Sequence, residues 1–543
     1  MPPGRYIPLL ALALALALPA PAALAQQPDS LRITGTEIGA RLRLLASDLF
    51  EGRAPGTYGD TLTTTYLASE LSAFGLRPGA DSGWLQPVTI VVHQPDSTSP
   101  NTARLSGRVT RTLEHGRDIR FANDGAAAEV MGSGELVFVG HAIYAPPYQW
   151  DDFDFLNLRG KIAVILLGEP TLAGDSTRFN GRRASRFGSM DTKLAELGRR
   201  GAVGALLVRP AGSISRAPVT GRRRLLRHAQ ADSLKFFGAL SDSVLATLLP
   251  RGRSLAALLQ SASRPGFRPL PLGVRLDYAF RTRPIKVRTN NVIGVIPGRD
   301  SALAREHVVL SAHWDAYGIG RPVNGDSIYN GALDDASGVS GLLAVARALA
   351  AYPQRRSLTF LFTTAEEWGL LGARAYVCEG PLPMERVAAN LNVDDGIELW
   401  GVKRDAAPLG TEHSTLGAAA SRVASKMGLR MTPDPYEEEG FFLRADNFPF
   451  AEAGVPALYM ALGTDAVGQP PGYVDGLVRE YLRTHYHRPS DDYETVVRDL
   501  EGTRQFAEFV RDLAIAVANN DTRPEWLPGA EFQRAAGTSG CAP

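Results

Sequence analysis

The chain has 543 residues, of which 44% are hydrophobic and 21% are charged, a composition typical of folded proteins and not of disordered ones. At roughly 150 residues per domain, this length predicts two to four domains. The 58 basic and 57 acidic residues leave a net charge of +1, which gives no electrostatic reason to expect nucleic acid or an anionic membrane as a partner. The two cysteines, Cys378 and Cys541, exclude a thiolate zinc site and a disulfide framework but allow one long-range disulfide.

The first 25 residues have the pattern of a signal peptide. Arg5 supplies the positive start, an apolar run covers 7–18, and Ala23-Leu24-Ala25 is a small-x-small cleavage signal before Gln26. The apolar run is short for a membrane span of about 20 residues, although a retained anchor stays an alternative. We therefore expect an exported protein, periplasmic or extracellular, with no stable membrane insertion once the signal is removed.

A mainly β domain is predicted inside a larger domain. Helical spacing of apolar residues covers 34–50 and 61–74. From about residue 125, short apolar runs lie between glycine, proline and aspartate clusters, which is typical of strands. The strands are expected at 135–139, 161–167 and 201–208, with one helix at 191–199. We predict a separate domain at 126–265, in which the basic run Arg222-Arg223-Arg224 is interpreted as a solvated face.

The second half of the chain alternates between buried strands and helices, which predicts an α/β sheet with helices on both faces. The expected strands cover 291–296, 307–311 and 358–363, and a helix covers 338–351. We predict one discontinuous domain built from 26–125 and 266–525, followed by a loose tail at 526–543.

Four strand ends or loops in this half carry potential metal ligands. They contain His313 and Asp315, Asp334 and Asp335, Glu366 and Glu367, and Asp394 and Asp395. Ligands of open α/β sheets collect outside the carboxyl ends of strands, so this pattern predicts one convergent site. Clustered carboxylates must be neutralised, protonated or metal-bound, and two imidazoles with several carboxylates suit zinc, two ions better than one. Among the nine histidines, His313 is favoured because it ends an apolar strand and Asp315 can accept its other ring N–H.

Motifs of other chemistries are absent from the sequence. Gly-x-Ser-x-Gly, the elbow of serine hydrolases, does not occur. His-Glu-x-x-His and the phosphate-binding Gly-x-x-x-x-Gly-Lys-Ser/Thr loop are also missing.

As a set, the motifs resemble the co-catalytic di-zinc exopeptidases, a family that includes bacterial leucyl aminopeptidases, glutamate carboxypeptidase and the catalytically dead transferrin receptor. The matching motifs are His313-x-Asp315, Gly331-x-x-Asp334-Asp335-x-Ser337-Gly338, Glu366-Glu367, Asn392-x-Asp394 and Tyr486-His487. Ala46-Ser47-Asp48-x-x-Glu51-Gly52-Arg53 looks like the opening of secreted members, and Gly140-His141, Gly160-Lys161 and Gly201-Ala202 resemble a protease-associated domain. The resemblance implies a mixed central sheet flanked by helices, with this β domain inserted.

The resemblance also implies a role for each site residue. Asp334 would bridge two Zn²⁺ ions, with His313 and Asp394 completing one site and Glu367 and His487 the other. His487 is preferred over His485, which is interpreted as a structural neighbour, because Tyr486-His487-Arg488-Pro489-Ser490-Asp491 matches the family pattern Tyr-His-x-Pro-x-Asp. Glu366 would be the general base, Asp315 would orient His313, and Tyr486 would stabilise the oxyanion unless it is a packed aromatic. The Asp334–Asp335 peptide is expected to be cis.

The implied activity is hydrolysis of peptide substrates, with an aminopeptidase favoured. Three glutamates and Asp446 against one arginine in 436–446 suit a free amine, and Phe441 and Phe442 are expected to line an apolar pocket unless they belong to the core. A carboxypeptidase or dipeptidase and a glutaminyl-cyclase-like acyltransferase with one zinc stay alternatives. A receptor on the same fold is disfavoured because the ligand set is intact. The oligomeric state is not predicted.

Overall fold

The computed structural model describes most of the chain from residue 31 to residue 532. The described ranges are 31–96, 98–99, 101–125, 127–154, 156–170, 179, 181, 183–216, 223–225, 234–394 and 396–532. The predicted signal peptide, Arg222 and Cys541 lie outside them, and Cys378 is disulfide-bonded. Within the described ranges, none of the helices combines the length and the apolar character that crossing a membrane requires.

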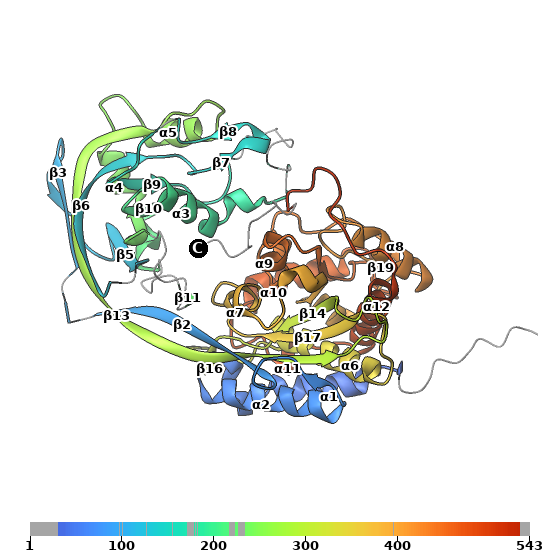
Figure 1. Cartoon of the computed structure of the whole chain (residues 1–543). Coiled ribbons are helices and arrows are strands. Elements are labelled where there is room, and N and C mark those ends of the chain that lie inside the picture. Colours follow the sequence, from blue (N-terminus) through green and yellow to red (C-terminus); the bar gives the residue numbers. More distant parts are fainter. Residues whose placement is uncertain are drawn as a thin grey trace, which may run out of the picture.

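One long strand, β13 (Leu270–Ile296), runs through both lobes of the molecule (Figure 1). Its first part pairs antiparallel with β3 (Thr102–Gly107) and β6 (Glu129–Phe138) of the upper lobe. Its last part pairs antiparallel with β2 (Leu85–Pro95) and β17 (Ser357–Thr363) of the lower lobe. The prediction of a strand only at 291–296 was too short, because the stretch before it alternates buried and exposed residues over a half-buried surface instead of forming one apolar run.

The lower lobe contains the predicted mixed sheet flanked by helices, so the predicted α/β fold is confirmed. The strands follow the order β21 (Ala457–Met460), β18 (Val387–Val393), β14 (His307–His313), β17 and β13. The first four are parallel to one another, whereas β13 is antiparallel to β17. The carboxyl ends of the four parallel strands therefore meet at one edge, where ligand sites of such sheets form.

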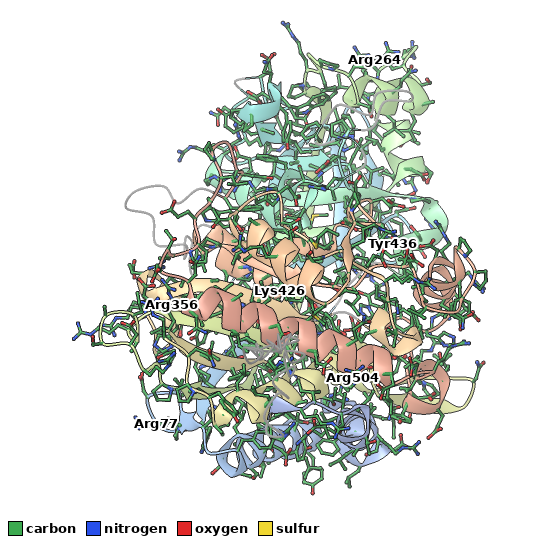
Figure 2. The ribbon with its side chains drawn as sticks, turned by 90° about the vertical axis from the view of Figure 1, so that its right-hand side faces the viewer. Arg77, Arg264, Arg356, Lys426, Tyr436 and Arg504 are labelled. Carbon is green, nitrogen blue, oxygen red and sulfur yellow. The ribbon has the colours of Figure 1, made fainter. Side chains whose placement is uncertain are left out.

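Helices cover both faces of this sheet because successive strand residues point to opposite sides. Val308, Leu310 and Ala312 of β14 belong to one hydrophobic core, whereas Val309 belongs to another. The first core includes residues of α1 (Gly35–Leu45), α2 (Tyr58–Ala73), α6 (Gly338–Ala350), α8 (Leu416–Lys426), α10 (Tyr473–Thr484) and α12 (Glu501–Asn519). The second includes residues of α7 (Leu371–Glu379) and α9 (Asn447–Glu452). Figure 2 shows α12, which carries Arg504, lying across this lobe.

The upper lobe has a second run of parallel strands: β6, β9 (Ile162–Ile165), β10 (Gly204–Arg209) and β12 (Phe236–Ser241). β5 (Ile119–Asn123) pairs antiparallel with β12 at the edge. Because β3, β5 and the first part of β13 belong to this sheet, the lobe extends beyond the predicted limits of 126 and 265. Its helices are α3 (Met190–Arg199), α4 (Asp242–Thr247) and α5 (Leu255–Ala262).

Two surface predictions were wrong. The described start of the predicted loose tail is packed, since Phe532 is 4% exposed and its ring lies 5.7 Å from both Phe442 and Trp526. The described part of the predicted solvated arginine run is partly buried between the lobes. Arg224 there forms an ion pair of 2.9 Å with the fully buried Asp124.

Candidate metal centre

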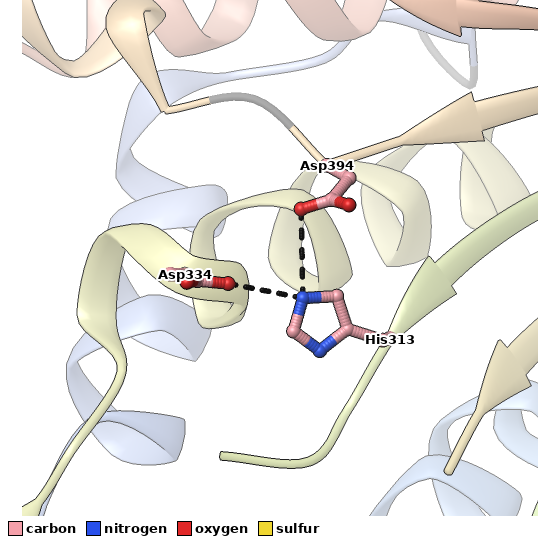
Figure 3. A group of neighbouring side chains, drawn as sticks. All are labelled: His313, Asp334 and Asp394. Carbon is pink, nitrogen blue, oxygen red and sulfur yellow. Dashed lines mark hydrogen bonds and ion pairs between the residues drawn. The ribbon is translucent and has the colours of Figure 1, made fainter. Parts of the chain in front are cut away.

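His313 lies at the carboxyl end of β14 and is 1% exposed. Its Nδ1 lies 3.1 Å from the backbone oxygen of Asp315, which can only accept, so Nδ1 carries the proton. The Asp315 carboxylate, predicted to take this N–H, lies farther away at 3.7 Å. Nε2 faces Asp334, 3.0 Å away, and Asp394, 3.5 Å away (Figure 3), and when the ring is neutral this nitrogen carries the lone pair. This is the tautomer that a metal-binding imidazole needs.

A second group of side chains shares Asp334 with the first. His487 Nε2 lies 3.3 Å from the other Asp334 carboxylate oxygen and 3.2 Å from Glu367. Its Nδ1 lies 2.9 Å from the hydroxyl of Tyr317, which the sequence analysis did not identify. The ligand atoms of each group lie within 4.8 Å of one another. The five predicted ligands therefore converge, with one carboxylate between two imidazoles.

The loop that carries Asp334 is held by two other aspartates. The Asp334–Asp335 peptide is cis, as predicted. The Asp491 carboxylate accepts hydrogen bonds from the backbone N–H groups of Leu333 at 2.9 Å and Asp334 at 3.2 Å. Asp335 accepts from the N–H groups of His313 at 3.3 Å and Gly338 at 3.0 Å. These contacts couple the loop to β14 and fix the direction of the Asp334 side chain.

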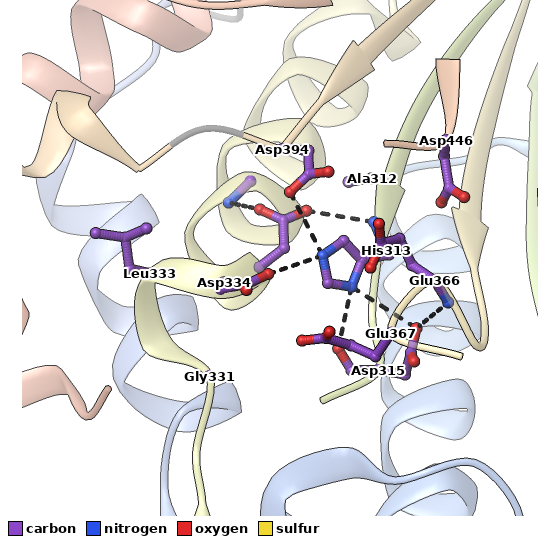
Figure 4. Close-up of polar contacts among 12 residues, drawn as sticks. Ala312, His313, Asp315, Gly331, Leu333, Asp334, Glu366, Glu367, Asp394 and Asp446 are labelled. Carbon is purple, nitrogen blue, oxygen red and sulfur yellow. Dashed lines mark hydrogen bonds and ion pairs between the residues drawn. The ribbon is translucent and has the colours of Figure 1, made fainter. Parts of the chain in front are cut away.

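Glu366 and Glu367 follow β17 and complete a dense group of carboxylates (Figure 4). The Glu366 backbone N–H donates to Asp315 at 3.0 Å. Burial and the charges of Asp394 and Glu367 raise the pKa of Glu366 well above its ordinary value. Burial opposes protonation of His313, but the charges of Glu366 and Asp394 still raise the pKa of this imidazole well above its usual range. The negative charge of these buried carboxylates therefore exceeds the positive charge of the side chains beside them. A bound cation would compensate for this excess.

Arg53 joins three segments beneath this centre, and the sequence analysis assigned it no role. Its guanidinium, 1% exposed, donates to the backbone oxygens of Leu45 at 2.7 Å, Trp314 at 2.8 Å, Asn330 at 2.6 Å and Gly331 at 2.9 Å. A guanidinium can serve several acceptors at once because its donors are arranged as a rigid fork. The sequence signal that could have identified Arg53 was its position at the end of the motif Ala46-Ser47-Asp48-x-x-Glu51-Gly52-Arg53.

We expect Arg53→Ala to lower the free energy of unfolding by about 3 kcal/mol or more, because four buried carbonyls lose a charged donor. Urea unfolding measures the change. Arg77→Ala removes an exposed arginine from β1 (Arg77–Pro78) and is expected to stay within about 0.5 kcal/mol of the parent. Equal stabilities of the two variants would contradict the role assigned to Arg53.

A mainly apolar cavity of about 120 Å³ opens at the centre, with Asp334, Glu366 and Asp394 among its lining residues. Apart from Asp434 and Arg444, the rest of the lining is mainly apolar and aromatic and includes Ile397, Trp400, Leu409, Tyr436, Phe441, Tyr459, Leu462 and Val478. Phe441 thus lines the pocket as predicted. Phe442 does not, since it is 9% exposed within the core and lies against Gly410.

Outside this lining, the predicted glutamate run makes other contacts. Glu437 pairs with Arg183 at 3.4 Å, and Glu439 lies 3.8 Å from Arg444. The prediction that this run receives an amine is therefore wrong. The carboxylates that border the cavity are those of Asp334, Glu366 and Asp394 at the centre, together with Asp434.

His485 and Tyr486 directly precede His487 and differ in their contacts. The Tyr486 hydroxyl accepts a hydrogen bond of 3.0 Å from Arg444, and the residue lines the cavity beside Glu366. Burial raises the pKa of Tyr486, so its hydroxyl stays protonated. His485 lies 2.9 Å from the Ser490 hydroxyl and belongs to neither group of possible ligands, whereas His487 belongs to the second group.

Curated proteins with the name leucine aminopeptidase 2 match part of this chain. Leucine aminopeptidase 2 of Trichophyton rubrum is 26% identical over 286 residues, covering 50% of this chain and 52% of the relative. Probable leucine aminopeptidase 2 of Aspergillus fumigatus is 37% identical over 224 residues, covering 39% and 41%. The chain thus spans about half the length of the curated relatives it matches.

A solved structure and a family model also match the chain. The aminopeptidase from Aneurinibacillus sp. strain AM-1 superposes with a TM-score of 0.52 at 16% identity, over 91% of this chain and 96% of that one, which shows a shared fold. Residues 291–514, which contain all five predicted ligands and Glu366, match the model of peptidase family M28. The resemblance of the motifs is therefore confirmed over this segment, which is similar to peptidase family M28.

Proposed function

We propose that this chain is a zinc-dependent aminopeptidase that removes N-terminal residues from peptides. The observation that carries the proposal is the pair of ligand groups sharing Asp334 at the mouth of an apolar cavity. The names of the curated relatives, which are leucine aminopeptidases, support it. The signal-peptide pattern in residues 1–25 of this chain suits an enzyme that acts on peptides outside the cytoplasm.

The donor set fits two zinc ions. Each group offers one imidazole, one carboxylate of its own and the shared carboxylate of Asp334. His313 and Asp394 would hold one ion, and Glu367 and His487 the other. Mixed imidazole and carboxylate ligands are those that zinc prefers when a coordination position stays open for catalysis.

Bound zinc would supply Lewis-acid polarisation of the scissile carbonyl and a lowered pKa for the attacking water. Glu366 borders the cavity without belonging to either ligand group, so its carboxylate is free to take a proton from that water and return it to the leaving amine. Because Arg444 donates to the Tyr486 oxygen, the Tyr486 hydrogen stays available for the developing oxyanion.

The apolar cavity would receive the side chain of the N-terminal residue. Asp334, Glu366, Asp394 and Asp434 line the cavity, and their carboxylates are the candidate acceptors for a positively charged amine. Arg444, the arginine of this lining, already contacts Tyr486 and Glu439, which disfavours capture of a substrate carboxylate in this cavity.

We expect the enzyme to hydrolyse leucine arylamide at least about 100-fold faster than its N-acetylated analogue. Acetylation removes a charge-assisted contact worth about 1.5–3 kcal/mol and adds bulk at the same place. Initial rates on the two substrates, with and without a chelator, measure the difference.

The alternatives make opposite predictions in the same assay. Preferential cleavage of N-blocked peptides with a free C-terminus would identify a carboxypeptidase, and cyclisation of glutaminyl peptides would identify an acyltransferase. Activity that survives complete removal of the metal would contradict the zinc mechanism.

A further inference from the structure

Glu366 lines the apolar cavity and also a second and larger cavity of about 1170 Å³. The lower lobe contributes Tyr317, Glu367, Trp368 and His487, and the inserted lobe contributes its arginines. We call this space the interlobe cleft. A peptide with its N-terminal side chain in the apolar cavity and its first carbonyl at the metal centre would extend its remaining residues into this cleft.

The inserted lobe sends one short strand into the cleft. β11 (Arg224–Leu225) pairs antiparallel with β2, with Arg224 opposite Val91 and Leu225 opposite Ile90, and lies between the lobes in Figure 1. Leu225 is 4% exposed and belongs to the same hydrophobic cluster as Ile90, against which Trp368 also packs. The backbone directly after Arg223 is therefore anchored beside the segment that carries Glu366 and Glu367.

Arg223 presents its guanidinium to the cleft. Its central carbon lies 4.3 Å from the centre of the Trp368 ring, one residue after Glu367. Stacking on an aromatic ring uses the flat face of the guanidinium and leaves the N–H edge available for a carboxylate in the same plane.

The other arginines of the cleft are already engaged. Arg186 pairs with Glu531 at 3.0 Å, Arg224 with Asp124 at 2.9 Å and Arg374 with Glu452 at 2.9 Å. Arg199 pairs with Glu196, and Arg444 donates to Tyr486. For Arg223, by contrast, no carboxylate of the described ranges lies within ion-pair distance, and its buried Nε has no hydrogen-bond partner there. A partly buried cation that has no ion-pair partner within contact distance can bind an anionic ligand.

We propose that Arg223 binds a substrate carboxylate on the leaving-group side of the scissile bond. This carboxylate is either the C-terminal carboxylate of a short peptide or an acidic side chain shortly after the scissile bond. The inference rests on the proposed aminopeptidase function and adds a substrate class to it, namely peptides whose leaving group is anionic. The inserted lobe thereby contributes a specificity-determining residue to a site otherwise built by the lower lobe.

Two matched substrate pairs test this in the metal-loaded full chain. Leucyl-glycyl-glycine is compared with its C-terminal amide, and leucyl-aspartyl amide with leucyl-asparaginyl amide, by kcat/KM at constant ionic strength. The parent enzyme is expected to favour the anionic member of at least one pair by about 10-fold or more, which is typical of a charge-assisted arginine contact. The favoured pair identifies whether the carboxylate is terminal or on a side chain.

Arg223→Gln is expected to bring the preferred ratio close to one, and Arg223→Lys to restore part of it. Arg199→Gln is the matched control, because Arg199 lines the same cleft but is 63% exposed and paired with Glu196. It should keep the parent ratio. A purely structural role of Arg223 would lower both members of a pair together and leave the ratio unchanged.

The outcomes separate this inference from the function on which it rests. Parent ratios near one in both pairs, with leucine arylamide still cleaved, would overturn the role of Arg223 and leave the aminopeptidase proposal intact. An unchanged ratio in Arg223→Gln would also overturn it. Failure to cleave any substrate with a free amine would instead reject the proposed function.

Discussion

Glu366→Gln is expected to lower kcat on leucine arylamide by about 10² to 10⁴-fold while the bound metal stays unchanged. Glutamine has nearly the same shape but cannot take a proton from the attacking water. Glu366 lies outside both ligand groups, so no metal ligand is lost. Steady-state kinetics together with elemental analysis of the dialysed protein measure both quantities.

A glutamate-to-glutamine substitution outside the metal centre serves as the control. Glu135→Gln lies on an exposed position of β6 in the inserted lobe and should keep the parent kcat and metal content. Retained activity in Glu366→Gln would remove Glu366 as the base. Loss of metal together with activity would make it a ligand instead.

Asp334→Asn is expected to remove more metal than a change at any other ligand. Asp334 is the one residue that belongs to both groups, and its two carboxylate oxygens face different imidazoles. An amide carries no charge and offers one good acceptor in place of two, so both ions lose a ligand at once. We expect the apparent affinity for zinc to fall by more than the 10–100-fold that is typical of losing a partner outside the ligand set. Metal-to-protein ratios during dialysis against a zinc buffer measure it.

Variants of ligands that belong to only one of the two groups provide the comparison for this test. Asp394→Asn and Glu367→Gln each touch one group and should weaken one ion only. Asp277→Asn, at an exposed position of β13, should bind zinc like the parent. Equal metal loss in the Asp334, Asp394 and Glu367 variants would show that Asp334 is not shared, and the two-ion assignment would then be wrong.

Most of the metal centre was predictable from local sequence. His313 ends an apolar strand, Glu366 and Glu367 follow another, and Asp394 follows a third. Parallel strands place their carboxyl ends at one edge of a sheet, so these residues had to meet whatever the details of packing. His487 was identifiable only because its neighbours match a family pattern, since it comes from a loop far along the chain.

Tertiary packing alone decided the contacts between distant segments. Phe441 and Phe442 are adjacent and chemically identical, and only the fold sends one to the cavity and the other to the core. Likewise, nothing in the local pattern distinguishes Arg223 from a solvated arginine. Its position depends on the pairing of β11 with β2, more than a hundred residues away in sequence, and on Trp368 of the other lobe. Periodicity and motifs encode which residues end a strand, because that is a local property. Which surfaces of two lobes face each other depends on the summed burial of residues remote in sequence, and no short pattern contains that sum.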